Sequence, residues 1–347
     1  EGVQVRALVV HPGVDFSVAD VHNGWCDGLR TLGWDVREYN LHDRLAFYSA
    51  AHPARDGEWV QAFSFESSCQ MAAQQIKSAC YEWWPDLVIL ISDFFVDQRL
   101  VEIIKSRGHK VAVVFTESPY EDTKQLERLD GIDCAVINDP LNLDLYREVV
   151  PASFYAPHCY RPEIHHPGPA SPDVVSEACF VGTGMPSRVE FLEQVDWTGI
   201  ELLLAGAWKD LSPESPLRPH LLYEDSRWCV MNDHTATIYR SSLTSFNVYR
   251  IENNEGVHDR ADGIAMGPRE VELAACGLWF ARQSRPEGDD LLPMLPIFST
   301  PEEMGEQIRW AIAHPDERQE AATAARAALS DRTFDNNVRA LMTALGL

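Results

Sequence analysis

Apolar and polar residues follow two alternating patterns along this chain. Short runs of aliphatic and β-branched residues, typical of buried strands, are separated by segments in which apolar residues recur every three to four positions, as on one face of a helix. In the first half the strand-like runs are 5–10, 34–39, 87–91, 111–115, 134–137 and 153–155, and the helix-like segments are 20–32, 59–83, 98–105 and 141–149. This alternation predicts a doubly wound parallel sheet.

A second alternating set follows a proline-rich stretch at 156–171, which is typical of a domain crossing. Its strand-like runs are 178–182, 201–205, 245–249 and 278–281, and its helix-like segments are 188–195, 235–241 and 268–276. We therefore expect an α/β fold of the GT-B type, with two Rossmann-like domains, residues 1–160 and 161–330, and a cleft between them.

The carboxy-terminal end is almost wholly helical in pattern. Thr300 is followed by a proline and, three positions on, by Glu303, which is the sequence form of a helix amino terminus. We expect the last helix, residues 331–347, to close the fold, with the N-terminal domain as a candidate packing partner.

Composition and charge narrow the functional classes. The 347 residues include 53 acidic and 29 Lys or Arg side chains, giving a formal charge of −24. Such a surface repels nucleic-acid backbones and anionic lipid, so duplex DNA is the least suitable partner. Any phosphate site must therefore be built locally from arginines, lysines and backbone N–H groups.

Cysteine usage and hydropathy favour a cytoplasmic protein. The eight cysteines form no C-x-x-C pair and several lie in apolar runs, so we expect reduced core residues and not disulfides or zinc ligands. No apolar run approaches the roughly 20 residues of a membrane span. An Asp289-Asp290 pair is present but no D-x-D beside an apolar strand, so we expect no metal and no cofactor other than a co-substrate.

In open α/β sheets ligands bind beyond the carboxyl ends of the strands, so the residues just after each strand are the candidates. In the first half, His11, Asp15 and His22 follow or face the first strand and are candidates for a base that deprotonates an acceptor hydroxyl, if they do not simply form a turn and a helix cap. Gly13 in the same turn is suited to unusual dihedral angles. Glu117, after the fourth strand, is either functional or a cap of the next turn.

Small and cationic residues follow the strands of the second half. Gly182 and Gly184 form a strand-to-helix turn whose N–H groups could hold a phosphate, and Arg188 lies one turn further on. After the next strand, Lys209 is a candidate for neutralising a diphosphate.

Two further positions of the second half extend the set of candidates. The side chain of Trp208, which precedes Lys209, could stack on a base or simply pack. Arg250 offers a second cation after the strand that ends near Asn247.

The segment with the most specific pattern runs from Arg269 to Gly277. Arg269 and Glu272 are three positions apart and share one face of a helix, either as a helical salt bridge or as two ligand-binding groups. Gly277 is suited to the left-handed residue that ends the helix.

This segment resembles the R-x-x-E-x-x-A-x-G signature of GT-B glycosyltransferases related to the CgeB/YkvP spore-maturation proteins, and is similar to the E-A-x-A-x-G donor motif of wider retaining families. Further segments agree in order over residues 85–345: 116–120, 180–182, 205–208, 236–242 with Tyr239, Asn247 and 297–304.

The resemblance implies a nucleotide-diphosphate sugar held mainly by the second domain. Glu272 would accept hydrogen bonds from the ribose hydroxyls, and Arg269, Arg250 and Lys209 would lie near the diphosphate. The first domain would present the acceptor. The wider families place another glutamate eight positions before the one matching Glu272, whereas this chain has Ile264 there.

Three classes of function are compatible with these residues. The first is a metal-independent glycosyltransferase whose acceptor is a protein, a glycan, a small molecule or a modified nucleic acid. The second is a non-catalytic GT-B-like binding or coat-associated protein. The third is a sugar-nucleotide epimerase, which would turn over the donor without an acceptor.

Overall fold

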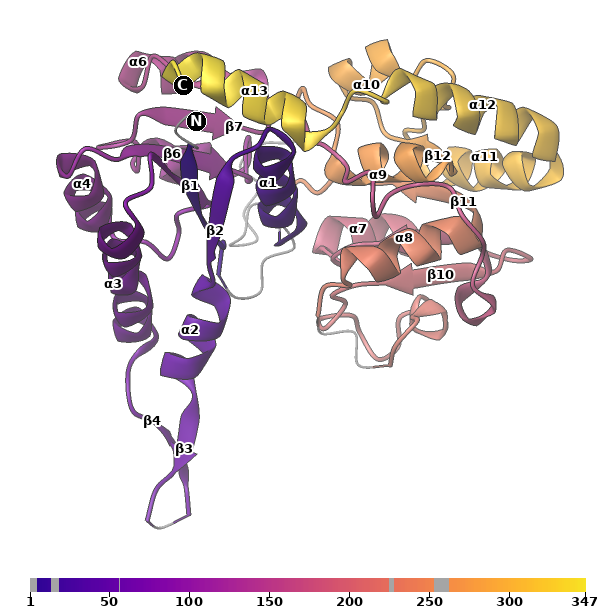
Figure 1. The fold of residues 1–347 in the computed structure, drawn as a ribbon. Coiled ribbons are helices and arrows are strands. Elements are labelled where there is room, and N and C mark those ends of the chain that lie inside the picture. Colours follow the sequence, from indigo (N-terminus) through magenta and orange to yellow (C-terminus); the bar gives the residue numbers. More distant parts are fainter. Residues whose placement is uncertain (1–4, 14–18, 56, 225–227, 253–261) are drawn as a thin grey trace. The chain divides into compact units, whose positions relative to one another are not determined.

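The chain divides into two compact units. The computed structural model describes residues 5–13, 19–55, 57–224, 228–252 and 262–347 (Figure 1). One unit consists of Glu1–Ala156 with Phe334–Leu347, and the other of Pro157–Thr333. These limits lie a few residues from those expected at 160 and 330. Within the described residues, no helix is both long and apolar enough to cross a membrane.

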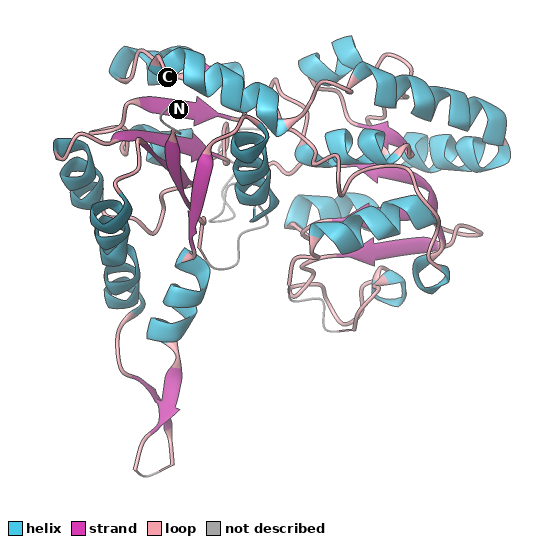
Figure 2. Ribbon diagram, in the orientation of Figure 1, coloured by secondary structure: helices cyan, strands magenta, loops and turns pink. Residues whose placement is uncertain are grey.

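The first unit is built on a parallel sheet of six strands (Figure 2). In spatial order the strands are β2 (Asp35–Tyr39), β1 (Arg6–Val10), β5 (Leu87–Ile91), β6 (Lys110–Phe115), β7 (Cys134–Ile137) and β8 (Phe154–Tyr155). Every residue of β5 is buried, as expected where helices cover both faces of a parallel sheet. The α/β class and the parallel sheet are confirmed.

Helices cover the two faces of this sheet. On one face, Leu8 of β1 and Leu90 of β5 share a core with three helices, α2 (Leu41–Ser49), α3 (Phe65–Trp83) and α4 (Gln98–Ser106). On the other face, Trp25 and Leu29 of helix α1 (Ala19–Thr31) are buried beside β1 and β2. The remaining helices of the segment are α5 (Asp122–Leu126), η1 (Pro140–Asn142) and α6 (Leu143–Val149).

The expected helix over 59–83 is too long at its start. Residues Trp59–Gln61 form strand β4, which pairs antiparallel with β3 (Ala51–Pro53), and α3 begins only at Phe65. Ser64 fixes this boundary because its side chain accepts a hydrogen bond from the N–H of Ser67. The helix α2, which we did not predict, is capped in the same way by Asn40.

The last helix, α13 (Phe334–Leu345), belongs to the first unit and packs on α1. Two glycines of α1 permit the close approach. A Cβ on Gly24 would lie 2.2 Å from the Phe334 ring, and one on Gly28 would lie 2.9 Å from the Phe334 backbone. The described contacts of α13 are therefore with elements of the first unit.

The second unit contains a four-stranded parallel sheet. Its spatial order is β10 (Leu202–Ala205), β9 (Ser176–Val181), β11 (Ser242–Asn247) and β12 (Trp279–Arg282). The helices are η2 (Pro172–Val174), α7 (Pro186–Glu193), η3 (Arg218–His220), α8 (Asn232–Ser241), α9 (Pro268–Cys276), α10 (Pro286–Leu291), α11 (Pro301–Ala313) and α12 (Pro315–Ala328). The bounds of α9 are those predicted.

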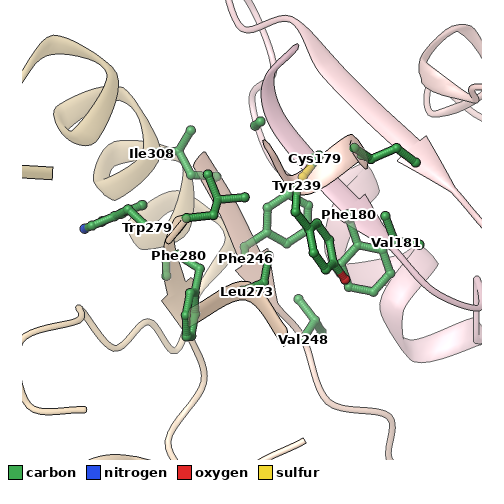
Figure 3. Close-up of a cluster of buried hydrophobic side chains, with 14 of the residues drawn as sticks. Cys179, Phe180, Val181, Tyr239, Phe246, Val248, Leu273, Trp279, Phe280 and Ile308 are labelled. Carbon is green, nitrogen blue, oxygen red and sulfur yellow. The ribbon is translucent and has the colours of Figure 1, made fainter. Parts of the chain in front are cut away.

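Aromatic side chains fill the core of this unit (Figure 3). Phe180 of β9 stacks on Phe246 of β11, with ring centroids 5.4 Å apart, and Tyr239 of α8 is buried in the same cluster. Two predicted helix ends are also confirmed, since Thr300 and Glu303 cap α11 reciprocally and Gly277 ends α9 with a φ of 76°.

The strand orders place a topological switch in each sheet. The chain moves from β1 outward to β2 and then returns to β5 on the other side of β1, and it moves in the same way from β9 to β10 and back to β11. Crevices for ligands form at the carboxyl ends of the two strands that flank such a reversal. Ligands are therefore expected at the ends of β9 and β11 in the second unit, and at the ends of β1 and β5 in the first.

Candidate functional site

Arg269 joins the two strands that flank the switch in the second unit. Its Nε donates to the carbonyl oxygen of Val181 at the end of β9 (2.8 Å), and its Nη1 donates to Oδ1 of Asn247 at the end of β11 (2.6 Å). The guanidinium also lies over the Phe180 ring, 4.1 Å from the centroid, where a cation is attracted to the aromatic face. The side chain is thus held in one orientation at the carboxyl edge of the sheet.

Glycines make room for this guanidinium. A Cβ on Gly182 would lie 2.1 Å from Arg269 Nη2, so a side chain there would displace the arginine. Gly206 has a φ of 113° and approaches the backbone of Gly182, where a Cβ would lie 2.3 Å from the carbonyl oxygen. Gly184 is confined in a similar way, because a Cβ there would lie 2.4 Å from the Trp208 ring. Packing therefore requires glycine at both positions of the expected turn, 182 and 184.

The Nη2 group of Arg269 is available for a ligand. Nη2 has no hydrogen-bond partner within the described residues, and Arg269 is only partly buried. Arg188 of α7 lies nearby, with its Nε donating to the carbonyl of Val248 (2.8 Å) and its carbon Cζ 5.6 Å from the centroid of the Phe180 ring. Two guanidinium groups therefore gather at the ends of β9 and β11, as an anion site requires.

A carboxylate occupies the amino terminus of α7, which follows the glycine turn expected to hold a phosphate. Glu252 is buried, and its two oxygens accept hydrogen bonds from the N–H (2.7 Å) and the hydroxyl (2.8 Å) of Ser187 in the first turn of α7. Hydrogen bonds from Ser187 lower the pKa of Glu252 against the opposing effect of burial. An N–H group at the amino terminus of α7 is thus already bonded to a carboxylate, which leaves the Arg269 guanidinium as the main candidate for an anion-binding group.

A buried network supports the position of α9. Glu270 is fully buried, and its carboxylate accepts hydrogen bonds from the N–H of Gly267 (2.9 Å) and from the hydroxyl of Tyr249. Burial raises the pKa of Glu270 and raises that of Tyr249 well above its usual value. Sequence reasoning missed Glu270, although its place in the first turn of the helix is typical of such a cap.

Glu272 lies on the face of α9 that meets α8. Its Oε1 is 3.4 Å from Nδ2 of Asn232, the first residue of α8, and its charge adds to burial in raising the pKa of Tyr239. Arg269 bonds elsewhere and forms no ion pair with Glu272 in the part of the chain that the structure describes. The helical salt bridge that we considered is therefore absent there.

The other predicted donor-side residues lie in three different settings. Trp208 is buried, donates to the carbonyl of Ala205 (3.2 Å) and packs edge-on against Phe180, so its ring is part of the core and presents no open face to a base. Lys209 beside it is exposed, and Arg250 is half-buried. Tyr239 lies in the core with its hydroxyl drawn in Figure 3.

In the first unit, His11 follows β1 directly and lies beside two other histidine rings. Asp15 lies outside the described residues. The ring of His11 is 5.1 Å from that of His22 and 5.8 Å from that of His42, and burial together with these two rings lowers the pKa of His11 to about 4. Gly13, with a φ of 113°, donates its N–H to His11 Nδ1 (3.2 Å), so the neutral ring carries its hydrogen on Nε2.

Two carboxylates lie after neighbouring strands of the same sheet. Glu117 follows β6 and is buried, with its backbone N–H donating to Oε1 of Gln125 (3.3 Å). Asp93 follows β5 at the switch, and Arg128 Nε lies 2.8 Å from its Oδ2 while burial raises its pKa. Sequence reasoning passed over Asp93, although the rule that pointed to His11 and Glu117 applies equally to it.

Within the described residues, one group of three side chains is close enough together to be considered as a metal site. His22, Cys26 and Glu38 offer one ligand atom each within 4.8 Å of one another. Arg30, however, already donates to a Glu38 carboxylate oxygen (2.5 Å), which leaves two buried groups, His22 and Cys26, with a separation of 3.8 Å between Nε2 and Sγ. This pair is a buried contact of α1 and supplies too few ligands for a structural zinc site.

Comparisons with known proteins agree with the fold. Residues 188–343 match the family described as glycosyl transferase-like. Comparison with curated protein sequences gives no match.

Three solved structures illustrate the likeness. An alpha-glucosyltransferase in complex with UDP and a 13-mer DNA containing an HMU base has a TM-score of 0.65 at 11% identity, over 99% of this chain and 100% of that one. Sucrose-phosphate synthase from Thermosynechococcus elongatus has a TM-score of 0.63 at 12% identity, over 98% of this chain and 97% of that one. A putative UDP-N-acetylglucosamine 2-epimerase from Listeria monocytogenes has a TM-score of 0.62 at 9% identity, over 98% of this chain and 96% of that one. The chain therefore has the α/β fold of the GT-B glycosyltransferases.

Proposed function

We propose that this protein is a glycosyltransferase that takes its sugar from a nucleotide-diphosphate donor bound at the carboxyl edge of the second unit's sheet. The observation that carries the proposal is Arg269, which is held by Val181 and Asn247 with Nη2 left for a ligand at the topological switch. A diphosphate is the donor group that such a fixed cation recognises. The match of residues 188–343 to a glycosyl transferase-like family supports the same assignment.

The chemistry follows from charge. Loss of a nucleoside diphosphate from the sugar concentrates negative charge on the departing phosphate. A fixed guanidinium stabilises that charge more strongly in the transition state than in the ground state. Arg269 and Arg188 would supply this stabilisation without a metal. Glu272, one turn along α9, would accept hydrogen bonds from the ribose hydroxyls. The ordered motifs that resemble the CgeB/YkvP proteins favour this placement of the donor.

The acceptor belongs to the first unit in this proposal. His11, Asp15 and Glu117 follow its strands, and Asp93 at the end of β5 joins them as a candidate. The acceptor's chemical class stays open, and with a net charge of −24 a small molecule, glycan or protein suits the chain better than duplex DNA.

Calorimetric titration with uridine diphosphate, and with guanosine diphosphate as the second probe, tests the donor site. We expect Arg269→Ala to weaken binding by about tenfold or more, since a charge-assisted hydrogen bond contributes about 1.5–3 kcal/mol. Arg309→Ala is the matched control, because Arg309 is a partly buried arginine of the same unit whose guanidinium pairs with Asp196. Equal affinity in wild type and Arg269→Ala would overturn the assignment.

Turnover separates the three classes of function. A transferase should release nucleoside diphosphate from a labelled nucleotide-sugar faster when its acceptor is present, an epimerase should convert the donor alone, and a binding protein should do neither. The putative epimerase among the structural neighbours makes the second measurement necessary.

A further inference from the structure

The second unit has a large cavity at the opposite edge of its sheet. Its volume is about 650 Å³, and it lies where β11 and β12 begin, at Ser242 and Trp279. The last residue of α9, Cys276, and Gly277 after it form part of the wall. Because the strands are parallel, this edge is remote from the carboxyl ends where Arg269 lies, and the cavity is not part of the donor site.

The charge of this cavity is the reverse of the charge of the chain. Its lining includes Arg240, Arg318 and Arg326 and contains no aspartate or glutamate among the described residues, although acidic side chains outnumber Lys and Arg by 53 to 29 in the whole chain. Neutral polar groups, such as those of Gln319 and Thr323, complete the wall. A polar concave site of this sign attracts anions locally on a protein that otherwise repels them.

No carboxylate neutralises these arginines within the described residues. Arg240 donates to the carbonyl of Ile164 (3.1 Å) and Arg318 to that of Ala311 (2.8 Å), while Arg326 forms no hydrogen bond there. Arg240 and Arg326 lie in the last turns of α8 and α12, where the helix dipole favours a cation. A carbonyl or a helix end carries at most a partial charge, so most of each positive charge is left for a ligand.

The spacing of the arginines indicates how many anionic groups the ligand has. Arg318, Ala322 and Arg326 are four positions apart, so they form one stripe of α12, and the small Ala322 leaves space between the two guanidinium groups. Eight residues of helix correspond to about 12 Å along its axis. The Arg318 guanidinium is held by the carbonyls of Ala311 and Ile312, before the start of α12, so two phosphate groups match it and Arg326 better than one does.

We propose that this cavity binds a small molecule that carries two or more phosphate groups, held between the α12 stripe and Arg240. The inference does not depend on the proposed function, because the cavity lies at the opposite edge of the sheet from Arg269. Arg326 is the residue to change, since its side chain is exposed and forms no hydrogen bond to the described residues.

Tripolyphosphate and inorganic phosphate are the probes, titrated calorimetrically at constant ionic strength. The Arg269→Ala protein is used throughout so that the donor site does not contribute. We expect tripolyphosphate to bind at least about ten times more tightly than inorganic phosphate, and Arg326→Glu to weaken tripolyphosphate by about tenfold or more. The midpoint of thermal unfolding without ligand, compared between variants, shows that each is folded.

Arg339→Glu is the matched control, because it makes the same change in net charge on α13, where Arg339 lies 3.8 Å from Asp335. It should leave the affinity nearly unchanged. The proposal is overturned if tripolyphosphate does not bind the Arg269→Ala protein, if Arg326→Glu has no effect, or if Arg339→Glu weakens binding to the same extent, since that result would indicate a general effect of net charge.

Discussion

Arg269 and Asn247 are 22 positions apart in the chain and are joined by a hydrogen bond of 2.6 Å at the end of β11. The buried amide fixes the guanidinium without neutralising its charge, which an aspartate at the same position would do. This distinction provides a direct test of an anion site.

We expect Asn247→Asp to weaken uridine diphosphate binding by about tenfold or more. The new carboxylate would still accept the hydrogen bond from Arg269, but its charge would repel the diphosphate and neutralise the cation. Calorimetric titration measures the effect, and the unfolding midpoint should show a folded protein. Affinity equal to that of wild type would mean that the ligand does not contact Arg269 through its anionic groups.

Gly182→Ala should act through Arg269. The added methyl group would lie 2.1 Å from Nη2, so the guanidinium must move, and we expect affinity for uridine diphosphate to fall by about tenfold. In the Arg269→Ala protein the same substitution should have little further effect, because the group with which it collides is gone. Additive losses in this double-mutant cycle would show that Gly182 acts independently of the arginine.

Glu272→Ala should weaken uridine diphosphate binding by about 1–3 kcal/mol through the loss of charge-assisted hydrogen bonds to the ribose. A 2′,3′-dideoxy analogue should bind wild type and variant equally, since it lacks the hydroxyls concerned. Glu306→Ala, an exposed glutamate of α11, is the control. An unchanged affinity for the natural nucleotide in the Glu272 variant would remove this residue from the donor site.

Substitution of the true acceptor base should lower turnover by roughly 100- to 10,000-fold while leaving donor affinity nearly intact. Asp15, His11 and Glu117 are the candidates in that order, with Asp93 added by the structure. If His11 is the base, the acidic limb of the pH profile should lie near its lowered pKa of about 4 and not near 6.5. Near-normal turnover in all four alanine variants would indicate either a retaining transfer without such a base or an acceptor bound by other residues.

Thiol chemistry should distinguish one cysteine from the core set. Cys229 is exposed, whereas Cys80, Cys134 and Cys276 are buried, and burial raises the pKa of each of these three to about 12. Iodoacetamide reacts with thiolate, so in the folded protein we expect rapid labelling of Cys229 and almost none of those three up to about pH 9. Mass spectrometry of the digested protein identifies the sites. Labelling of Cys276 at the rate of Cys229 would contradict the described packing.

Local patterns in the sequence account for most of the secondary structure. Runs such as 87–91 and 134–137 have the bounds predicted for them, because a strand buried on both faces must be apolar throughout, and α9 has its predicted bounds because Pro268 and Gly277 delimit it chemically. The same reasoning failed at residues 59–64, where a hairpin strand and the Ser64 cap replace the start of the predicted helix. Apolar spacing over so few residues does not distinguish a strand from a helix.

The sequence by itself placed Gly182 and Asn247 at or near the ends of strands and Arg269 in the first turn of a helix, since these positions depend only on local pattern. Tertiary structure alone decided what these residues contact. The strand order, which local pattern does not contain, brings β9 beside β11 and so lets one guanidinium reach Val181 and Asn247 together. It also decided that Trp208 is buried and that Glu252 caps α7, because burial and hydrogen-bond partners depend on contacts between segments far apart in the chain.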